Sequence, residues 1–234
     1  MDLLWCGPVS ASNLAAARWN GPAPRVVTVN HGAGGSVGSD AFKQLGADLL
    51  ASGSILTALG IRGDCVVCGF SAAHGLIEAI LSSDDFSRVA AVGAFDAYYT
   101  SVAKQPKPGY LRFAEAAAAG SRRMIMTSSL VAGPTYPSGA EATGALLASI
   151  PLSSAPLVDV PPARCRRAEL AGNLRWYTYD DRDVAKLSHV QHATVLAPFF
   201  VPELVSGLTE RGGGGGLLGF FALLGLAAWS FDGA

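Results

Sequence analysis

Hydrophobic residues along the chain gather into short continuous runs that alternate with longer stretches in which apolar and polar positions are mixed. The runs are rich in β-branched residues and predict strands over 25–32, 65–71, 88–96, 122–129 and 174–181, and "DLLWC" near the start is a sixth candidate. Apolar positions spaced three or four residues apart predict helices over 39–52, 72–83, 110–120, 139–150 and 194–208. Predicted strands and helices therefore alternate along most of the chain.

This alternation predicts one α/β domain with a mostly parallel central sheet and helices on both faces, because continuous apolar runs suit strands that are buried on both sides. Residues 151–167 are rich in proline, show no periodicity and are interpreted as a surface excursion. The prolines within 194–208 predict a break in the last helix. We expect the domain to cover 1–211, followed by a glycine linker over 212–216 and an apolar tail over 217–234.

The tail contains "LLGFFALLGLAAWSF", fifteen residues without a charge at 217–231. A helix that spans a membrane needs about 20 residues. Three interpretations stay open: a membrane anchor, a docking segment for another protein, and a helix folded back onto the domain. The first residues lack a basic region followed by a long apolar stretch, so we expect a cytoplasmic protein rather than a secreted one, with association to a membrane or particle through the tail left open.

The composition limits the kinds of partner that the protein is expected to bind. Only 15% of the residues are charged, against about 25% in typical domains, which suggests surface covered by a protein partner, a membrane or a second copy in a homo-oligomer. The net charge is −1 and no basic stripe is present, which argues against a nucleic-acid partner. Cys65 and Cys68 form a CxxC pattern inside a predicted strand, with no second pair nearby, so we interpret them as core thiols and predict no metal site.

Ser71 stands at the turn between the predicted strand 65–71 and the helix that follows it. A serine hydroxyl is a weak nucleophile until an adjacent base takes its proton, and a sharp strand-to-helix turn would expose it. Such a turn crowds the positions two before and two after the serine, and these are the small residues Gly69 and Ala73. The alternative is a tight turn that happens to contain a serine.

The segment "GFSAA" at 69–73 resembles the nucleophile elbow of the α/β-hydrolases, a family of serine esterases, lipases and peptidases, although Ala73 replaces the second glycine of the usual GxSxG. The resemblance covers roughly 25–207 and implies a three-layer sandwich. It also implies that "HGAGG", after the first long strand, helps to bind an oxyanion. The implied donors are the amides of Ala72 and Ala33, with Gly32 as an alternative and His31 beside the substrate; a glycine-rich turn or a phosphate-binding loop is the competing interpretation.

The family resemblance places the base on a histidine late in the chain, just before the terminal helix, where His189 and His192 both lie. We favour His189, because "KLSH" is typical of a loop whereas His192 is expected to begin the helix. The other histidine would then be a surface residue.

The acid that orients the base is harder to place. In the family it usually follows the strand before the last, but the strand 122–129 ends without a carboxylate. Some members carry the acid one strand earlier, where Asp96 ends an apolar run; an N-cap role for Asp96 is the alternative. Rival carboxylates are Asp180, Asp181 and Asp183, which lie close to His189 in sequence.

These residues together predict a serine hydrolase that cleaves a small-molecule or acyl ester or amide through an acyl-enzyme, with no metal or organic cofactor. The segment 128–142 is expected to form a rim over the site, with Thr135, Tyr136 and Ser138 as candidate substrate contacts. An acyltransferase would have the same sequence features. The alternative from another class is an inactive hydrolase-like module that docks through its apolar tail. The pattern does not identify the substrate.

Overall fold

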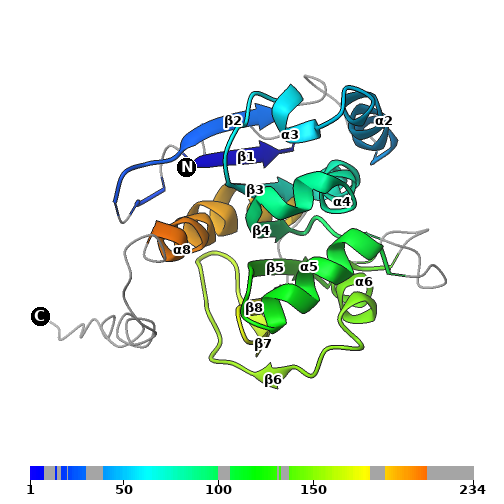
Figure 1. The fold of residues 1–234 in the computed structure, drawn as a ribbon. Helices are drawn as coiled ribbons and strands as arrows, with labels where there is room; N and C mark the ends of the chain where they lie inside the picture. The colour runs from blue at the N-terminus through cyan, green and yellow to red at the C-terminus, as the bar shows by residue number, and fades with distance from the viewer. Residues whose placement is uncertain are drawn as a thin grey trace, which may run out of the picture.

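The computed structural model describes residues 1–7, 14, 17–19, 21–29, 39–99, 106–130, 132, 137–179 and 188–209. Within them, eight strands form one sheet (Figure 1). The strands are β1 (Asp2–Cys6), β2 (Arg25–Val29), β3 (Cys65–Phe70), β4 (Val89–Phe95), β5 (Arg123–Ser129), β6 (Ser153–Ser154), β7 (Cys165–Ala171) and β8 (Leu174–Tyr179).

The order of the strands across the sheet is β2-β1-β3-β4-β5-β8-β7-β6. All neighbouring pairs from β2 to β8 are parallel, whereas β7 runs antiparallel to β8 and β6 antiparallel to β7. The predicted α/β class with a mostly parallel sheet is therefore confirmed. The sheet is mixed because of the antiparallel strand β7.

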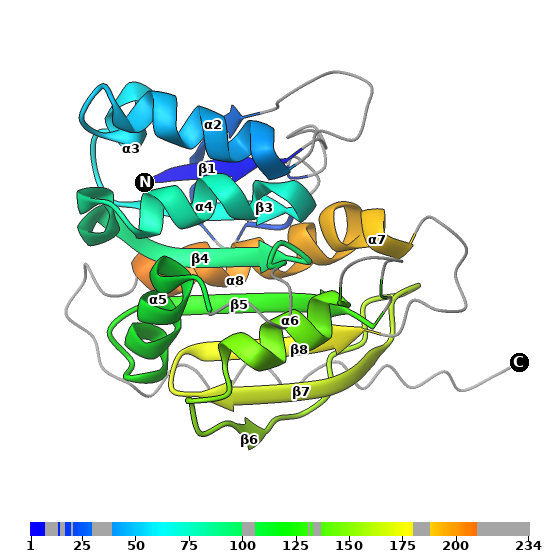
Figure 2. The same ribbon diagram turned by 90° about the vertical axis from the view of Figure 1, so that its right-hand side faces the viewer.

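The helices lie on both faces of the sheet, with α2, α4, α5 and α6 on one face and α8 on the other (Figures 1 and 2). Short 3₁₀ turns, η1 (Ser71–Ala73) and η2 (Asp84–Arg88), precede α4 and β4, and a π-helical turn, η3 (His192–Leu196), precedes α8. The helices are α2 (Ser39–Leu50), α3 (Ile55–Ala58), α4 (His74–Leu81), α5 (Pro108–Ala118), α6 (Gly139–Leu146), α7 (Ser188–Gln191) and α8 (Ala197–Thr209).

Alternate residues of the central strands supply two separate hydrophobic cores, because successive side chains of a strand point to opposite faces. On β1, Leu4 packs with the core under α4 and α5, whereas Leu3 packs with the core under α8. On β3, Val67 packs with the core under α4 and α5, and Val66 packs with the core under α8. Burial on both faces explains why these strands appear in the sequence as unbroken apolar runs.

Local signals in the sequence explain where several helices begin. Pro108 occupies the first turn of α5, where its missing N–H leaves no hydrogen bond unmade. Ser138 and Glu141 form a capping box at α6, in which each side chain bonds the other residue's backbone amide. The start of α6 matters for the site, because it fixes the residues that follow β5.

The interpretation of 151–167 as a surface excursion is wrong in part, because this segment contains β6 and the first residues of β7. Strand β7 was missed because it is half-exposed and carries arginines, so it has no continuous apolar run. Its signal is instead the two-residue connection Gly172–Asn173 to β8, a pair typical of a tight hairpin turn. Gly172 has a φ of 52°, which glycine adopts readily.

The last helical region differs from the expectation in two ways. It begins at Ser188, so both His189 and His192 lie in helical turns, and the predicted contrast between a loop and a helix start is wrong. Pro202 lies inside α8 without ending the helix. The missing N–H of Pro202 removes one intrahelical hydrogen bond, while Val201 and Leu204 beside it remain buried in the core.

The linker 212–216 and the tail 217–234 lie outside the described residues, so the three interpretations of the tail stay predictions. In the part of the chain that the structure describes, no helix combines the length and the apolar character needed to cross a membrane.

Candidate active site

The carboxyl ends of β3, β4 and β5 lie at one edge of the sheet, where parallel α/β sheets usually bind their ligands. Ser71 follows β3 directly and Asp96 follows β4 directly. His189 belongs to α7, which Figure 2 shows at the end of the sheet where the arrowheads of β4 and β5 lie. Three residues that are far apart in the sequence therefore reach the same edge.

The three side chains form a hydrogen-bonded chain, which we call the triad. The Nε2 atom of His189 lies 3.0 Å from the Oγ of Ser71, and its Nδ1 lies 2.7 Å from Oδ2 of Asp96. An ionised carboxylate only accepts hydrogen bonds, so Nδ1 carries the proton and its N–H donates a hydrogen bond to Asp96. The unprotonated Nε2 can then accept a hydrogen bond from the hydroxyl of Ser71. This is the arrangement that activates a serine nucleophile.

The backbone at Ser71 explains how its hydroxyl reaches the histidine. Ser71 has a φ of 53°, in the left-handed region that residues other than glycine rarely adopt, so the chain turns sharply from β3 into η1. A Cβ at Gly69 would lie 2.8 Å from the Cβ of Ala73 and 3.1 Å from the carbonyl oxygen of Cys6. The crowding expected on both sides of the serine is present, and it requires glycine at position 69.

The carboxylate of Asp96 is enclosed by donors. Its residue is 2% exposed and, like Ser71, has a positive φ, here 43°. The Oδ1 atom accepts a hydrogen bond of 3.0 Å from the amide of Ser129, and Oδ2 accepts one of 2.7 Å from the hydroxyl of Tyr99 besides that from His189. A Cβ at Gly139 would lie 2.1 Å from Oδ1. Glycine at the start of α6 is thus needed for the acid to fit.

These contacts determine the charge of the acid. Burial would raise the pKa of the Asp96 carboxyl, but the positive charge of His192 when protonated and the hydrogen bonds from His189 and the Ser129 amide together lower it below its ordinary value. Asp96 is therefore ionised near neutral pH. An N-cap role does not describe it, since its oxygens bond side chains and an amide of other segments.

The side chain of His189 lies between the buried carboxylate of Asp96 and the solvent. This side chain is 41% exposed, whereas that of Asp96 is 1% exposed. The ring packs against Phe70, with ring centroids 4.6 Å apart, and lies edge-on to the Tyr99 ring, with centroids 6.4 Å apart. The triad is thus buried at its acid and accessible at its serine and histidine, so a molecule from solvent can approach the hydroxyl.

His192 occupies a different environment, although it lies only one helical turn further on. It is 1% exposed, its Nδ1 lies 2.8 Å from the hydroxyl oxygen of Thr127, and Tyr179 packs edge-on against its ring at 6.1 Å. The expectation that the second histidine would be a surface residue is therefore wrong. The structure joins His189, and not His192, to Ser71.

Several candidates lie outside the described residues: His31, Gly32 and Ala33 of the glycine-rich loop, Thr135 and Tyr136 of the rim, and the rival acids Asp180, Asp181 and Asp183. Of the candidate oxyanion donors, Ala72 is described. It lies in the first turn of the helical segment that begins at Ser71, where backbone N–H groups have no intrahelical acceptor. An amide in this position is available to a ligand beside the serine.

The predicted rim borders a cavity of about 510 Å³ between α6 and the strands β7 and β8, and Ser71, Asp96 and His189 are not among the residues that line it. Leu130, Ser138 and Ala140 line it from the rim and α6, and Trp176 and Thr178 line it from β8. Ser138 caps α6 and is bonded to Glu141, and its contact with a substrate stays a prediction. The cavity lies next to the residues that hold Asp96.

Sequence reasoning missed the residues that hold the acid: Tyr99, Ser129 and Gly139. Tyr99 carries no motif, and the amide of Ser129 acts through its backbone, so neither has a signal in the sequence. Gly139 has a weak signal in the sequence, because a glycine after the serine of a capping box is an unusual first helical residue.

The cysteines are not part of the site. All four are free and buried, and burial raises the pKa of the Cys65 thiol to about 12, which makes it unreactive near neutral pH. Among the described residues, no three His, Cys, Asp or Glu side chains gather as they would around a metal ion.

Comparisons with known proteins add no relative: the chain matches no protein-family model, no curated protein and no solved structure. The geometry of the site is therefore the guide to its chemistry. That geometry provides a hydroxyl in contact with a base, a buried acid that fixes the base, and an amide beside the hydroxyl. Such an arrangement is suited to attack on a carbonyl carbon.

Proposed function

We propose that this protein is a serine hydrolase of the α/β-hydrolase type, with a three-layer sandwich around the sheet. The observation that carries the proposal is the continuous pair of hydrogen bonds from Ser71 through His189 to Asp96, at 3.0 and 2.7 Å. Their order along the chain, Ser then Asp then His, is the order of that family. The positive φ of Ser71 adds support, because it matches the strained turn of a nucleophile elbow.

In the proposed reaction, Ser71 Oγ attacks the carbonyl carbon of an ester or amide while His189 Nε2 takes its proton. The C=O π electrons move onto oxygen, where the amide of Ala72 and the amide of Ala33 or Gly32 stabilise the negative charge. The tetrahedral intermediate collapses, and His189 returns the proton to the leaving alcohol or amine. The product of this half-reaction is an acyl group on Ser71.

Water completes the proposed cycle. His189 removes a proton from a water molecule, the resulting hydroxide attacks the acyl carbon, and the Ser71 oxygen leaves with the proton from His189. Asp96 remains ionised throughout and stabilises the positive imidazole that forms in each step. An acyltransferase would use another acceptor in place of water. The exposure of His189 supports hydrolysis, because solvent can reach the base.

A fluorophosphonate probe, which phosphonylates activated serines and expels fluoride, tests the proposal without knowledge of the substrate. We expect the folded protein to be labelled, and Ser71→Ala to abolish the labelling. Ser87→Ala is the control, since Ser87 is a serine bonded to the carbonyl of Asp84, and it should be labelled like the wild type. A folded wild-type protein that does not react, or label that persists in Ser71→Ala, would refute the hydrolase assignment and favour the docking-module alternative.

A further inference from the structure

Tyr99 makes an unusual set of contacts around the triad acid. Its hydroxyl donates a 2.7 Å hydrogen bond to Oδ2 of Asp96, the same oxygen that accepts the hydrogen bond from His189. Its ring lies edge-on to two imidazoles, with centroids 6.4 Å from His189 and 6.0 Å from His74. The side chain of Tyr99 therefore contacts both the acid and the base.

We propose that Tyr99 is a positioning residue for the triad, which sets the direction of the Asp96 carboxylate and the strength of its bond to His189. This inference rests on the proposed function. The torsion that rotates a carboxylate about its Cβ–Cγ bond is soft, so the acid needs external donors to hold one orientation. The Ser129 amide holds Oδ1 and Tyr99 holds Oδ2, which leaves Oδ2 directed at Nδ1 of His189.

Tyr99 also competes with His189 for the electron density of one oxygen. A hydrogen bond from a neutral hydroxyl stabilises the carboxylate and weakens its attraction for the imidazolium that forms during the reaction. Without the hydroxyl, Asp96 would hold the protonated histidine more strongly, and a larger share of His189 would be protonated at a given pH. A protonated histidine does not accept the serine proton, so reaction at acid pH would decrease.

Other titratable groups face this cluster and stay constant in the test. His192 lies on the η3 side of Asp96, and His74 on α4 lies beside the Tyr99 ring with Lys107 bonded to its Nδ1. Tyr98, the adjacent residue, accepts a 3.1 Å hydrogen bond from the Lys107 amide and is not bonded to the triad. Tyr98→Phe therefore removes a neighbouring hydroxyl without changing the contacts of Asp96.

The test measures the second-order rate of fluorophosphonate labelling of Ser71 from pH 5 to 9. For Tyr99→Phe we expect a plateau rate about threefold to tenfold lower, as for loss of one ordinary hydrogen bond, and an acid limb whose midpoint moves to higher pH by about 0.3 to 1 unit. Tyr98→Phe should reproduce the wild-type profile. A Tyr99→Phe profile that superimposes on the wild type would overturn the inference.

A second substitution keeps the test valid if Tyr99→Phe folds poorly. Site-specific 3-fluorotyrosine at position 99 retains the hydroxyl and makes it a stronger donor, so the acid limb should move to lower pH, opposite to Tyr99→Phe. An unchanged limb would contradict the proposed competition. The two proposals fail in distinguishable ways: label that does not depend on Ser71 refutes the hydrolase, whereas Ser71-dependent label with unchanged profiles refutes only the role of Tyr99.

Discussion

Strand β4 has a buried aspartate at each end, and the two differ in what they bond. Asp85, in η2 before the strand, is 3% exposed, and Asp96 after the strand is 2% exposed. Each also lies close to a serine: Ser54 donates a 2.6 Å hydrogen bond to Asp85, and Ser71 reaches Asp96 through His189. Residue type and burial are thus the same at the two ends.

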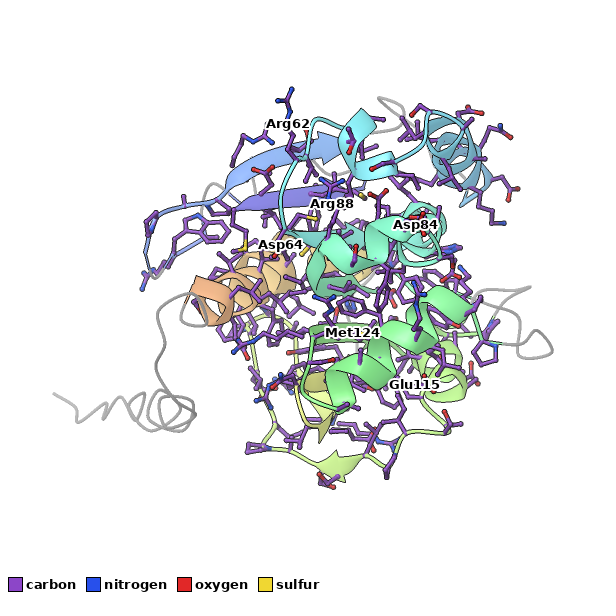
Figure 3. The ribbon with its side chains drawn as sticks, in the orientation of Figure 1. Arg62, Asp64, Asp84, Arg88, Glu115 and Met124 are labelled. Carbon is purple, nitrogen blue, oxygen red and sulfur yellow. The ribbon has the colours of Figure 1, made fainter. Side chains whose placement is uncertain are left out.

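The partner of Asp85 is Arg88, whose Nη1 lies 3.2 Å from the carboxylate. Arg88 is labelled in Figure 3. Asp85 also accepts a hydrogen bond from the Leu56 amide, and Arg88 donates to the carbonyl of Ile61 and to Thr57. The ion pair itself lies within η2, and the other bonds fasten α3 and the loop that follows it to η2. A guanidinium does not act as a proton acceptor in proteins, so this cluster is structural.

The comparison teaches that a buried carboxylate acquires a chemical role from the group beside it. At the amino end of β4 the partner carries a fixed charge, and it also donates to the backbone carbonyl of Ile61 and the hydroxyl of Thr57. At the carboxyl end the partner is an imidazole, a group that can both donate and accept a proton, and its side chain is 41% exposed. Variants at both ends test whether this distinction holds.

The largest expected difference separates His189→Ala from Arg88→Ala. Removal of the base should lower the rate of Ser71 labelling by about 10⁵- to 10⁶-fold, as for histidines in other triads, with little change in the melting temperature. Arg88→Ala leaves Asp85 buried without its cation and should cost about 3 to 5 kcal/mol of stability. Labelling kinetics and thermal unfolding of both variants check this, and a reversed pattern would remove the distinction between the two ends.

The second prediction exchanges each acid for its amide. Asp96→Asn should lower labelling by about 10⁴-fold, because an asparagine no longer fixes the tautomer of His189 or stabilises its positive form. Asp85→Asn should instead lower the free energy of unfolding by about 3 kcal/mol and leave the rate per folded molecule unchanged. Denaturant titration gives the folded fraction by which the rates are normalised. Equal losses of activity in both variants would argue against a special role of Asp96.

The third prediction concerns the space around Asp96. Gly139→Ala places a Cβ 2.1 Å from Oδ1, so the acid must move, and we expect labelling to decrease by about 10²-fold. Gly144→Ala is the matched control in the same helix, since its Cβ would meet only Trp176 at an ordinary 3.5 Å. That control should gain up to about 1 kcal/mol of stability through helix propensity. Activity retained in Gly139→Ala would show that the acid tolerates displacement.

The last prediction concerns His74, which is buried like His192. Burial, with the positive charge of Lys107 nearby, lowers the pKa of His74 from 6.5 to about 3. Between these two values the unfolded chain binds a proton that the folded protein does not, so His74 makes stability fall as the pH falls from about 6.5. His74→Asn should remove about 3 kcal/mol of the stability difference between pH 7 and pH 4, measured by urea unfolding. Parallel curves for variant and wild type would contradict this.

The sequence by itself determined features that depend on nearby residues. Gly69, Ser71 and Ala73 form a turn whose crowding involves Ala73 and Ile77, both within six residues of the serine, and one neighbouring strand. The apolar runs predicted the central strands because burial on both faces requires them. The capping box of α6 likewise acts over four residues.

Only the tertiary structure decided which distant groups meet. Ser71 and His189 are 118 positions apart, and the choice between two histidines one turn apart depends on how α7 lies over the ends of β3 and β4. Tyr99, the Ser129 amide and Gly139 meet at Asp96 because sheet register and helix packing bring three chain segments together. Such contacts depend on the register and packing of whole elements, which no local pattern of residues encodes.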